Sequence, residues 1–226
     1  MEKKKFYTEL AYVLGLAALA LGTAFMEGAD FGVSMVVAPA YLVYLKLSQA
    51  LPFFTFGMAE YTLQAVLLVV LMAVLRRFRF SYLFSFVTAV LYGLVLDGAM
   101  AAVAGIPHGD LAPRLALYGS GLLLCAAGVS LLFHTYIAPE VYELFVKEVS
   151  ARYGIDIHAF KTGYDCVSCL AAIFLSFAFF GLWHFEGVKL GTVVCALING
   201  WVIGRCSHFL EKHWEFQDGL KLPIRC

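Results

Sequence analysis

The chain has 226 residues, of which 62% are hydrophobic, and its 16 basic residues balance 16 acidic ones, so that the formal net charge is zero. Soluble domains contain about 45–50% apolar and about 25% charged residues, whereas only 14% of this chain is charged and its mean hydropathy is +0.84. These figures exclude a disordered chain and, because no basic surplus exists to neutralise phosphates, a nucleic-acid-binding protein. They predict an all-α protein that crosses a lipid bilayer several times.

The N-terminal segment predicts a retained membrane span rather than a cleaved signal peptide. Lysines at positions 3 to 5 precede an apolar stretch from Ala11 to Met26, and no small-residue cleavage site followed by a polar domain is present. Further stretches are also long enough for a hydrocarbon core of about 30 Å, which takes roughly 20 helical residues. The six expected spans lie at residues 9–28, 58–75, 82–104, 115–135, 163–182 and 188–207. The charged residues from Ser207 to Trp214 predict an extension of the last helix.

Two shorter helical segments follow the first and the fourth spans. One runs from Pro39 to Ala50 and the other from Pro139 to Tyr153, and each begins at a proline, which suits the first position of a helix. Charged residues alternate with an apolar face in the second segment. We expect both segments to lie in or near the membrane interface. For the more apolar first segment, a re-entrant half-helix is the alternative.

The placement of lysine and arginine predicts the orientation. With the N-terminus inside, thirteen basic residues fall on the inner side, and only Lys46, Arg114 and Lys189 fall on the outer side. Basic residues are concentrated in cytoplasmic loops of membrane proteins. We therefore expect both termini and the turn Arg76–Arg79 in the cytoplasm, and the loop Gly105–Arg114 outside.

An internal repeat relates the two halves of the chain. Shifting the chain by 106 residues places Tyr12, Gly15, Gly22, Phe54 and Gly57 on Tyr118, Gly121, Gly128, Phe160 and Gly163. The pair Ala38-Pro39 corresponds to Ala138-Pro139 once a shorter first connecting helix is allowed. This predicts a first repeat over residues 1–107 and a second over 108–226 with a cytoplasmic tail, which together form one membrane domain. Because each half has three spans, the second half enters the membrane from the opposite side and is inverted relative to the first. This arrangement is typical of secondary transporters.

Two glycine-containing stretches resemble segments of the YczE/YyaS/YitT family of bacterial membrane proteins. The stretch Gly191–Gly200 resembles the Gly-Thr…Gly element that closes each half, and the stretch Gly22–Ser34 resembles the end of the first span. The chain departs from the family where Met35–Val37 stands in place of Pro-Trp-Asp, and where Phe84-Ser85 stands in place of the first Gly-Thr. The resemblance implies a protein of the bacterial cytoplasmic membrane and assigns neither substrate nor site residues.

Ionisable side chains inside apolar segments are candidates for a binding site, because they are costly in hydrocarbon. Glu60 and Gln64 share one face of the second span, and Glu60 and Asp165 follow repeat-related glycines. This predicts a carboxylate pair near the axis between the halves, where it holds a cation or carries a proton. The structural alternative is that Asp165 pairs with Lys161 one turn earlier and that Glu60 caps its helix.

For Asp97 the sequence favours a role in binding over a purely structural role, because the residue lies deep in the third span with no basic residue nearby in the sequence. We expect it to be buried, with a partner from another span. The full set of expected substrate- or ion-binding residues is Glu60, Gln64, Asp97, Tyr164, Asp165 and Asn199, with Glu27, Asp30 and Lys161 as secondary candidates.

Catalytic and metal-binding patterns are absent from the sequence. Cys166 and Cys169 lie in an apolar helix with no second pair, and the histidines are dispersed, so that we expect neither a metal site nor a cofactor. Without a nucleophile and base at a recognisable spacing, an enzyme is the least favoured class.

The leading hypothesis is a small-molecule secondary transporter or exporter, with substrate and coupling ion between the two halves. Its expected partners are the lipid bilayer and an unidentified small molecule or ion. Two alternatives are open: a membrane scaffold or regulatory protein, and a substrate-binding subunit that needs a partner ATPase. The sequence also leaves the oligomeric state open, and a homo-oligomer is one of the partners it allows.

Overall fold

The computed structural model describes residues 4–105, 110–181 and 187–219, and within them it contains eight helices and two short strands. In chain order they are β1 (Lys4–Tyr7), α1 (Thr8–Gly28), α2 (Ala38–Leu47), α3 (Phe56–Leu75), α4 (Ser81–Val103), α5 (Leu111–Phe133), α6 (Val141–Tyr153), α7 (Ile157–Phe180), α8 (Leu190–His213) and β2 (Trp214–Gln217). Part of the expected outer loop Gly105–Arg114 lies outside the described residues.

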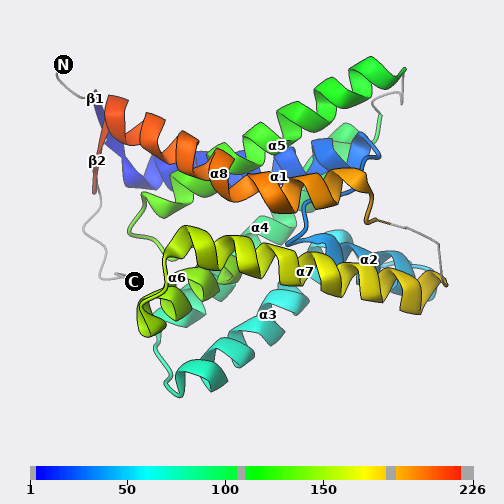
Figure 1. Cartoon of the computed structure of the whole chain (residues 1–226), viewed down its shortest axis with the longest axis horizontal. Helices are drawn as coiled ribbons and strands as arrows, with labels where there is room; N and C mark the ends of the chain where they lie inside the picture. Colours follow the sequence, from blue (N-terminus) through cyan, green and yellow to red (C-terminus); the bar gives the residue numbers. More distant parts are fainter. Residues whose placement is uncertain (1–3, 106–109, 182–186, 220–226) are drawn as a thin grey trace.

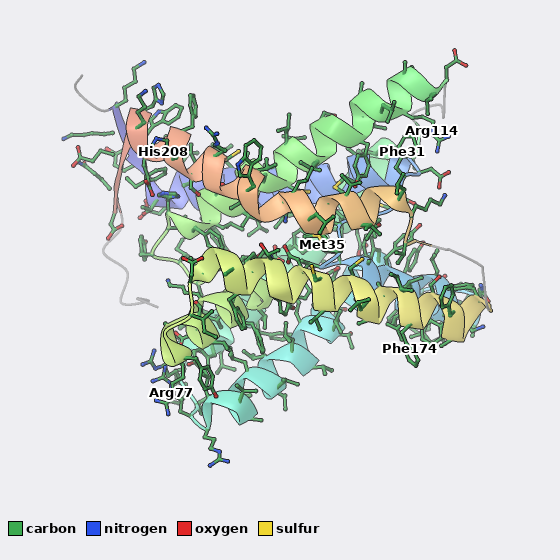
Figure 2. All side chains as sticks on the ribbon, viewed as in Figure 1. Phe31, Met35, Arg77, Arg114, Phe174 and His208 are labelled. Carbon is green, nitrogen blue, oxygen red and sulfur yellow. The ribbon has the colours of Figure 1, made fainter. Side chains whose placement is uncertain are left out.

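Six of these helices are long and apolar enough to cross a membrane, namely α1, α3, α4, α5, α7 and α8. This confirms the expected all-α, multi-span class. Large apolar side chains cover their outward surfaces: Leu94, Leu170 and Phe174 are 62%, 65% and 71% exposed, and Phe174 points away from the bundle (Figure 2). Apolar exposure on this scale fits contact with lipid rather than with water.

A capping side chain sets the start of α7. The Asp156 carboxylate accepts a hydrogen bond from the backbone N–H of Ala159 at 2.9 Å, so α7 begins at Ile157 rather than near residue 163. Such a cap satisfies an N–H that has no partner within the helix. The earlier start places Lys161 inside the helix, one turn before Asp165.

Helices α1 and α5 cross at glycines. A Cβ atom on Gly15 would lie 3.0 Å from the carbonyl oxygen of Gly128, and one on Gly22 would lie 2.6 Å from that of Gly121. The pairing runs in opposite directions along the two helices, so that they are antiparallel. Small residues allow such close backbone approach in membranes.

The same contacts reproduce the internal repeat. Gly15 corresponds to Gly121 and Gly22 to Gly128, so that exchanging the two halves turns one glycine contact into the other. Other helix pairs follow the same exchange: α1 packs on α4 as α5 packs on α8, and α2 packs on α7 as α6 packs on α3. Antiparallel α1 and α5 under such an exchange are the arrangement expected for inverted halves.

The two short helices begin inside the bundle. Residues Val37, Ala38 and Ala40 at the start of α2 are at most 7% exposed, whereas Leu47 at its end is 38% exposed. Helix α6 likewise starts at buried Glu140 and ends at Tyr153, which is 59% exposed. They lie toward opposite ends of the molecule (Figure 1). This geometry corresponds to the re-entrant alternative for α2, and it places the start of α6 deeper than the interfacial position expected for it.

The two ends of the chain meet in a feature that the sequence pattern did not predict. Helix α8 extends to His213, as expected for the charged extension, and β2 follows it directly and pairs in parallel with β1. The register runs from Lys4 opposite Trp214 to Tyr7 opposite Gln217. The strands therefore tie the start of α1 to the end of α8.

Candidate functional site: a buried acidic cavity between the two halves

A small, partly enclosed cavity lies where the two short helices begin. Ser34, Val36 and Val37, which precede α2, line one part of it, and Glu140 and Glu143, at the start of α6, line another. The remaining lining residues come from α1, α4, α5, α6, α7 and α8: Leu19, Thr23, Tyr92, Cys125, Val129, Tyr142, Lys161 and Asn199. Its volume is about 30 Å³, and a water needs about 10–15 Å³ of such space. The cavity therefore has room for one or two waters or a small ion.

Gln64 joins α3 to the start of α6. Its side-chain oxygen accepts a hydrogen bond from the backbone N–H of Val141 at 3.0 Å, one of the N–H groups that a helix leaves unpaired at its start. Its amide nitrogen donates to Oε2 of Glu140 at 3.1 Å and, more weakly, to Oε2 of Glu60 at 3.5 Å. Tyr142 also donates to Oε2 of Glu60 at 3.0 Å. Gln64 thus bridges two buried carboxylates from opposite halves.

Lys161 supplies the positive charge of the site. Its Nζ lies 3.1 Å from Oδ1 of Asp165 and 3.6 Å from Oε1 of Glu143. The side chains of Lys161, Glu143 and Asp165 are 6%, 5% and 0% exposed. The expected pairing of Asp165 with Lys161 is present, but it lies in the interior and includes a second carboxylate from α6.

Negative charge exceeds positive charge in this cluster. Glu60, Glu140, Glu143 and Asp165 are all buried, against Lys161 alone among the described residues around them. Oxygens Oε1 of Glu60 and Oε1 of Glu140 receive no hydrogen bond from any described residue. Isolated charges in a low-dielectric interior are strongly disfavoured. The arrangement is thus suited to accepting protons or a small cation.

Asp97 lies outside the cavity and is half-buried. Its carboxylate accepts hydrogen bonds from Thr55 Oγ1 at 2.7 Å and from the backbone N–H of Gly57 at 2.8 Å. The expected partners from another span are present, namely Thr55 immediately before α3 and Gly57 in its first turn. The expectation of a fully buried Asp97 was wrong, because the side chain lies beside this helix start rather than in the interior. A carboxylate at a helix N-terminus is stabilised by the helix dipole, and Asp97 has this structural role in the observed arrangement.

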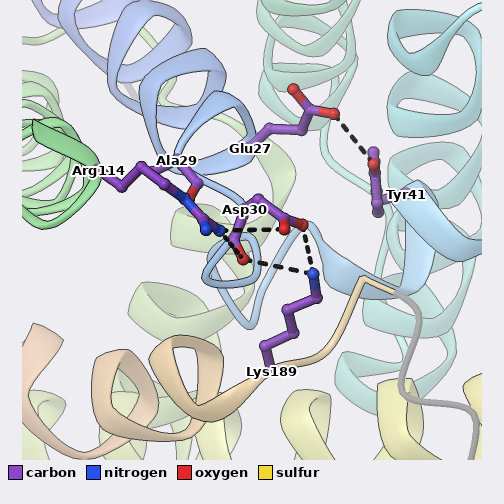
Figure 3. Close-up of polar contacts among 6 residues, drawn as sticks. All are labelled: Glu27, Ala29, Asp30, Tyr41, Arg114 and Lys189. Atoms are coloured by element: carbon purple, nitrogen blue, oxygen red, sulfur yellow. Dashed lines mark hydrogen bonds and ion pairs between the residues drawn. The ribbon is translucent and has the colours of Figure 1, made fainter. Parts of the chain in front are cut away.

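Glu27 and Asp30 lie where α1 finishes (Figure 3), and neither lines the acidic cavity. Tyr41 donates a hydrogen bond to Glu27 at 3.1 Å. Asp30 forms ion pairs with Arg114 of α5, at 3.0 Å, and with Lys189 just before α8. We name these three residues, Asp30, Arg114 and Lys189, the outer clasp, because they join the loop after α1 to the starts of two helices of the second half.

The opposite end carries a second charged cluster. Glu148 of α6 pairs with Arg77 at 3.0 Å and with Arg79 at 3.5 Å, and Tyr82 donates a hydrogen bond to it. Figure 2 places Arg77 at the end of the molecule opposite Arg114. Arg77 and Arg79 are thus engaged within the chain.

Asn199 and Tyr164 have different places in the structure. Asn199 is 6% exposed and lines the cavity. Tyr164 is half-buried and does not line the cavity. The centroid of its ring lies 5.6 Å from that of Phe145 and 5.8 Å from Nζ of Lys161. The structure therefore brings Glu60, Gln64, Lys161, Asp165 and Asn199 together.

Three members of the cluster were missed by sequence reasoning: Glu140, Tyr142 and Glu143. Their segment has many charged residues and was assigned to the interface for that reason. The signal that points inward is the repeated Ala-Pro pair, because Ala138-Pro139 corresponds to Ala38-Pro39 at the start of the more apolar α2.

A bundle of six apolar helices around a buried polar centre defines a multi-span α-helical membrane protein. The chain belongs to a family described as a family of unknown function (DUF6198), whose model matches residues 6–208. That range includes all six spans except the last turn of α8. No curated protein and no solved structure matches the chain.

Proposed function

We propose that the protein is a secondary transporter of a small solute or ion in the bacterial cytoplasmic membrane, and that the acidic cavity, which in this conformation has room for one or two waters or a small ion, is its coupling-ion site. One observation carries this proposal: the starts of two short helices, one from each half, line a single cavity that contains buried charges. Transporters with inverted repeats bind substrate and coupling ion at broken helices between the halves.

The asymmetry of the two ends supports the same proposal. The outer clasp closes the end at which α5 begins. At the end where β1 and β2 lie, a pocket of about 360 Å³ with both polar and apolar walls opens between α5, α6, α7 and α8, and Pro139, the neighbour of Glu140, forms part of its wall. Charged pairs join the two halves at both ends, since Glu148 contacts Arg77 and Arg79 at the end opposite the outer clasp. The asymmetry therefore lies in the pocket next to Pro139, which we assign to one state of an alternating-access cycle.

The orientation that goes with this proposal is testable by cysteine labelling. In a background without the native cysteines, Arg77→Cys is expected to react with a membrane-impermeant maleimide only in inside-out vesicles, and Leu111→Cys only in right-side-out vesicles. The reason is the excess of basic residues on the Arg77 side. The reverse labelling pattern would contradict the proposed orientation.

Transport itself is testable without a known substrate. Purified protein in liposomes on a solid-supported membrane is expected to give transient currents when one class of small solute is applied from a panel of ions and metabolites. Val129→Phe is expected to abolish the current, because Val129 is 5% exposed and lines the small cavity. Leu123→Phe on the same helix is the matched control, since Leu123 is 58% exposed and its substitution leaves the cavity unchanged.

The alternatives are outcomes of the same experiment. A folded protein that gives no current and is not thermally stabilised by any solute in the panel would favour a scaffold or regulatory role. Activity that appears only after an ATPase co-purifies would favour a binding subunit. The resemblance to the YczE/YyaS/YitT family fits the proposed membrane and adds no substrate.

A further inference from the structure

We infer that Glu140 and Glu60, bridged by Gln64, form a proton-binding pair that takes up and releases the coupling proton. This inference deepens the proposed function and rests on it for its purpose, although proton binding by the pair is measurable without transport. It adds to the central cavity a named ion, the proton, and a residue of α6 that the sequence pattern did not indicate.

The geometry provides each carboxylate with one occupied and one available oxygen. Gln64 and Tyr142 donate hydrogen bonds to the Oε2 atoms, whereas Oε1 of each glutamate has no donor among the described residues. Glu60 and Glu140 are 0% and 1% exposed. A buried carboxylate oxygen without a donor is costly, and a proton bound there removes the cost by neutralising the group.

The surroundings of Glu140 contain too little positive charge to neutralise it. The titratable groups that act on Glu140 or line its cavity come from six helices: Tyr12, Glu60, Tyr92, Cys125, Tyr142, Glu143, Lys161 and Asp165. Among these groups Lys161 is the single cation, and it already contacts Glu143 and Asp165. Glu140 and Glu60 therefore carry two of the three excess negative charges of the cluster, and each added proton relieves the repulsion between them.

The arrangement of ligands favours a proton over a metal ion. Within the part of the chain that the structure describes, no three carboxylate, imidazole or thiolate side chains are grouped in a way that could hold a metal ion. A proton needs only one oxygen. In the uptake step, an O–H bond forms at Oε1 of Glu140 while the O–H bond of a hydronium ion breaks, leaving a water; release reverses the step.

The pocket next to Pro139 is the side from which we expect protons to reach the pair. Glu140 lines the cavity, which has room for one or two waters. Pro139, its neighbour in the chain, lines the larger pocket, whose polar wall residues include His134, Lys147 and Glu211. The walls of the pocket and of the cavity thus contain two consecutive residues of the chain, Pro139 and Glu140.

The test is infrared spectroscopy of the purified full-length protein, titrated from mildly acidic to mildly alkaline pH. A protonated carboxyl group has a carbonyl stretch that carboxylates lack and that shifts in heavy water. We expect this band in the wild type to disappear reversibly as pH rises, and Glu140→Gln to lose most of it. Glutamine retains an oxygen that accepts the Gln64 hydrogen bond, so the variant is expected to fold.

Controls make the outcome specific. Glu215→Gln, which replaces an exposed glutamate on β2, is expected to keep the whole band, and Glu60→Gln to remove part of it. A wild type without a pH-dependent band, or a band unchanged in both Glu140→Gln and Glu60→Gln, would falsify the inference. A band that responds to exchange of sodium for a large organic cation at constant pH, and not to pH, would replace the proton by a metal cation.

Failure of this inference is distinguishable from failure of the proposed function. If currents are found but the band is absent, the protein transports without protonating this pair. If the band behaves as expected but no solute gives a current, the pair binds protons in a protein that does not transport. When both are present, Glu140→Gln is expected to remove the dependence of the current on an imposed pH gradient.

Discussion

Replacing Lys161 by methionine is expected to lower the free energy of unfolding by about 3–5 kcal/mol, the loss typical of removing one partner from a buried ionic pair. The ammonium group lies between Asp165 and Glu143, and the three side chains are between 0% and 6% exposed. Methionine has a similar length and leaves both carboxylates without their cation in a cluster that is already acidic. The measurement is unfolding of the purified protein in mixed detergent.

The rescue of this variant tests the cause. Adding Asp165→Asn and Glu143→Gln to Lys161→Met is expected to restore most of the lost stability, because the buried excess charge is then removed. Lys212→Met, at an exposed position of α8, is expected to change stability by less than about 0.5 kcal/mol. Equal stability of Lys161→Met and the wild type would show that water or lipid headgroups reach this cluster.

Adding one methyl group at Gly22 is expected to destabilise the protein by about 1–3 kcal/mol through overpacking. The new Cβ atom would lie 2.6 Å from the carbonyl oxygen of Gly121 and 2.7 Å from the backbone nitrogen of Cys125. These are backbone atoms of α5, so that a side-chain rotation cannot relieve the clash. Helices α1 and α5 must then move apart at the contact that joins the two halves.

Gly119→Ala is the matched control for this variant. Gly119 also lies in α5, but no heavy atom lies within 4 Å of the position of its added Cβ. Alanine is favoured over glycine in a helix by about 0.5–1 kcal/mol, so we expect Gly119→Ala to unfold at the same or a higher temperature than the wild type. If Gly22→Ala were equally well tolerated, the glycine crossing would not hold the two halves together.

Hydropathy and repeat spacing in the sequence are local properties of the chain, and they predicted the architecture well. Each span must satisfy its own backbone hydrogen bonds within the bilayer, so a long apolar stretch such as Ser81–Val103 is sufficient to specify a helix. The glycines at 15, 22, 121 and 128 also indicated the repeat, because close helix approach requires residues without side chains at regular positions. The burial of Glu60, Gln64 and Asp165 follows from a related reason, since a polar or charged side chain in an apolar stretch has to be buried with a partner; that they form a binding site stays a prediction.

The composition of the site depended on contacts between distant segments. Glu140 and Glu143 lie in a charged segment whose hydropathy favours the interface, yet Gln64 and Lys161 provide partners that allow the start of α6 to be buried. Asp97 shows the converse: it lies in an apolar stretch, but Thr55 and the start of α3 occupy its oxygens and remove it from the cavity. A residue's local sequence determines how costly its charge is, whereas the partners brought close by the fold determine where that charge is placed and what it binds.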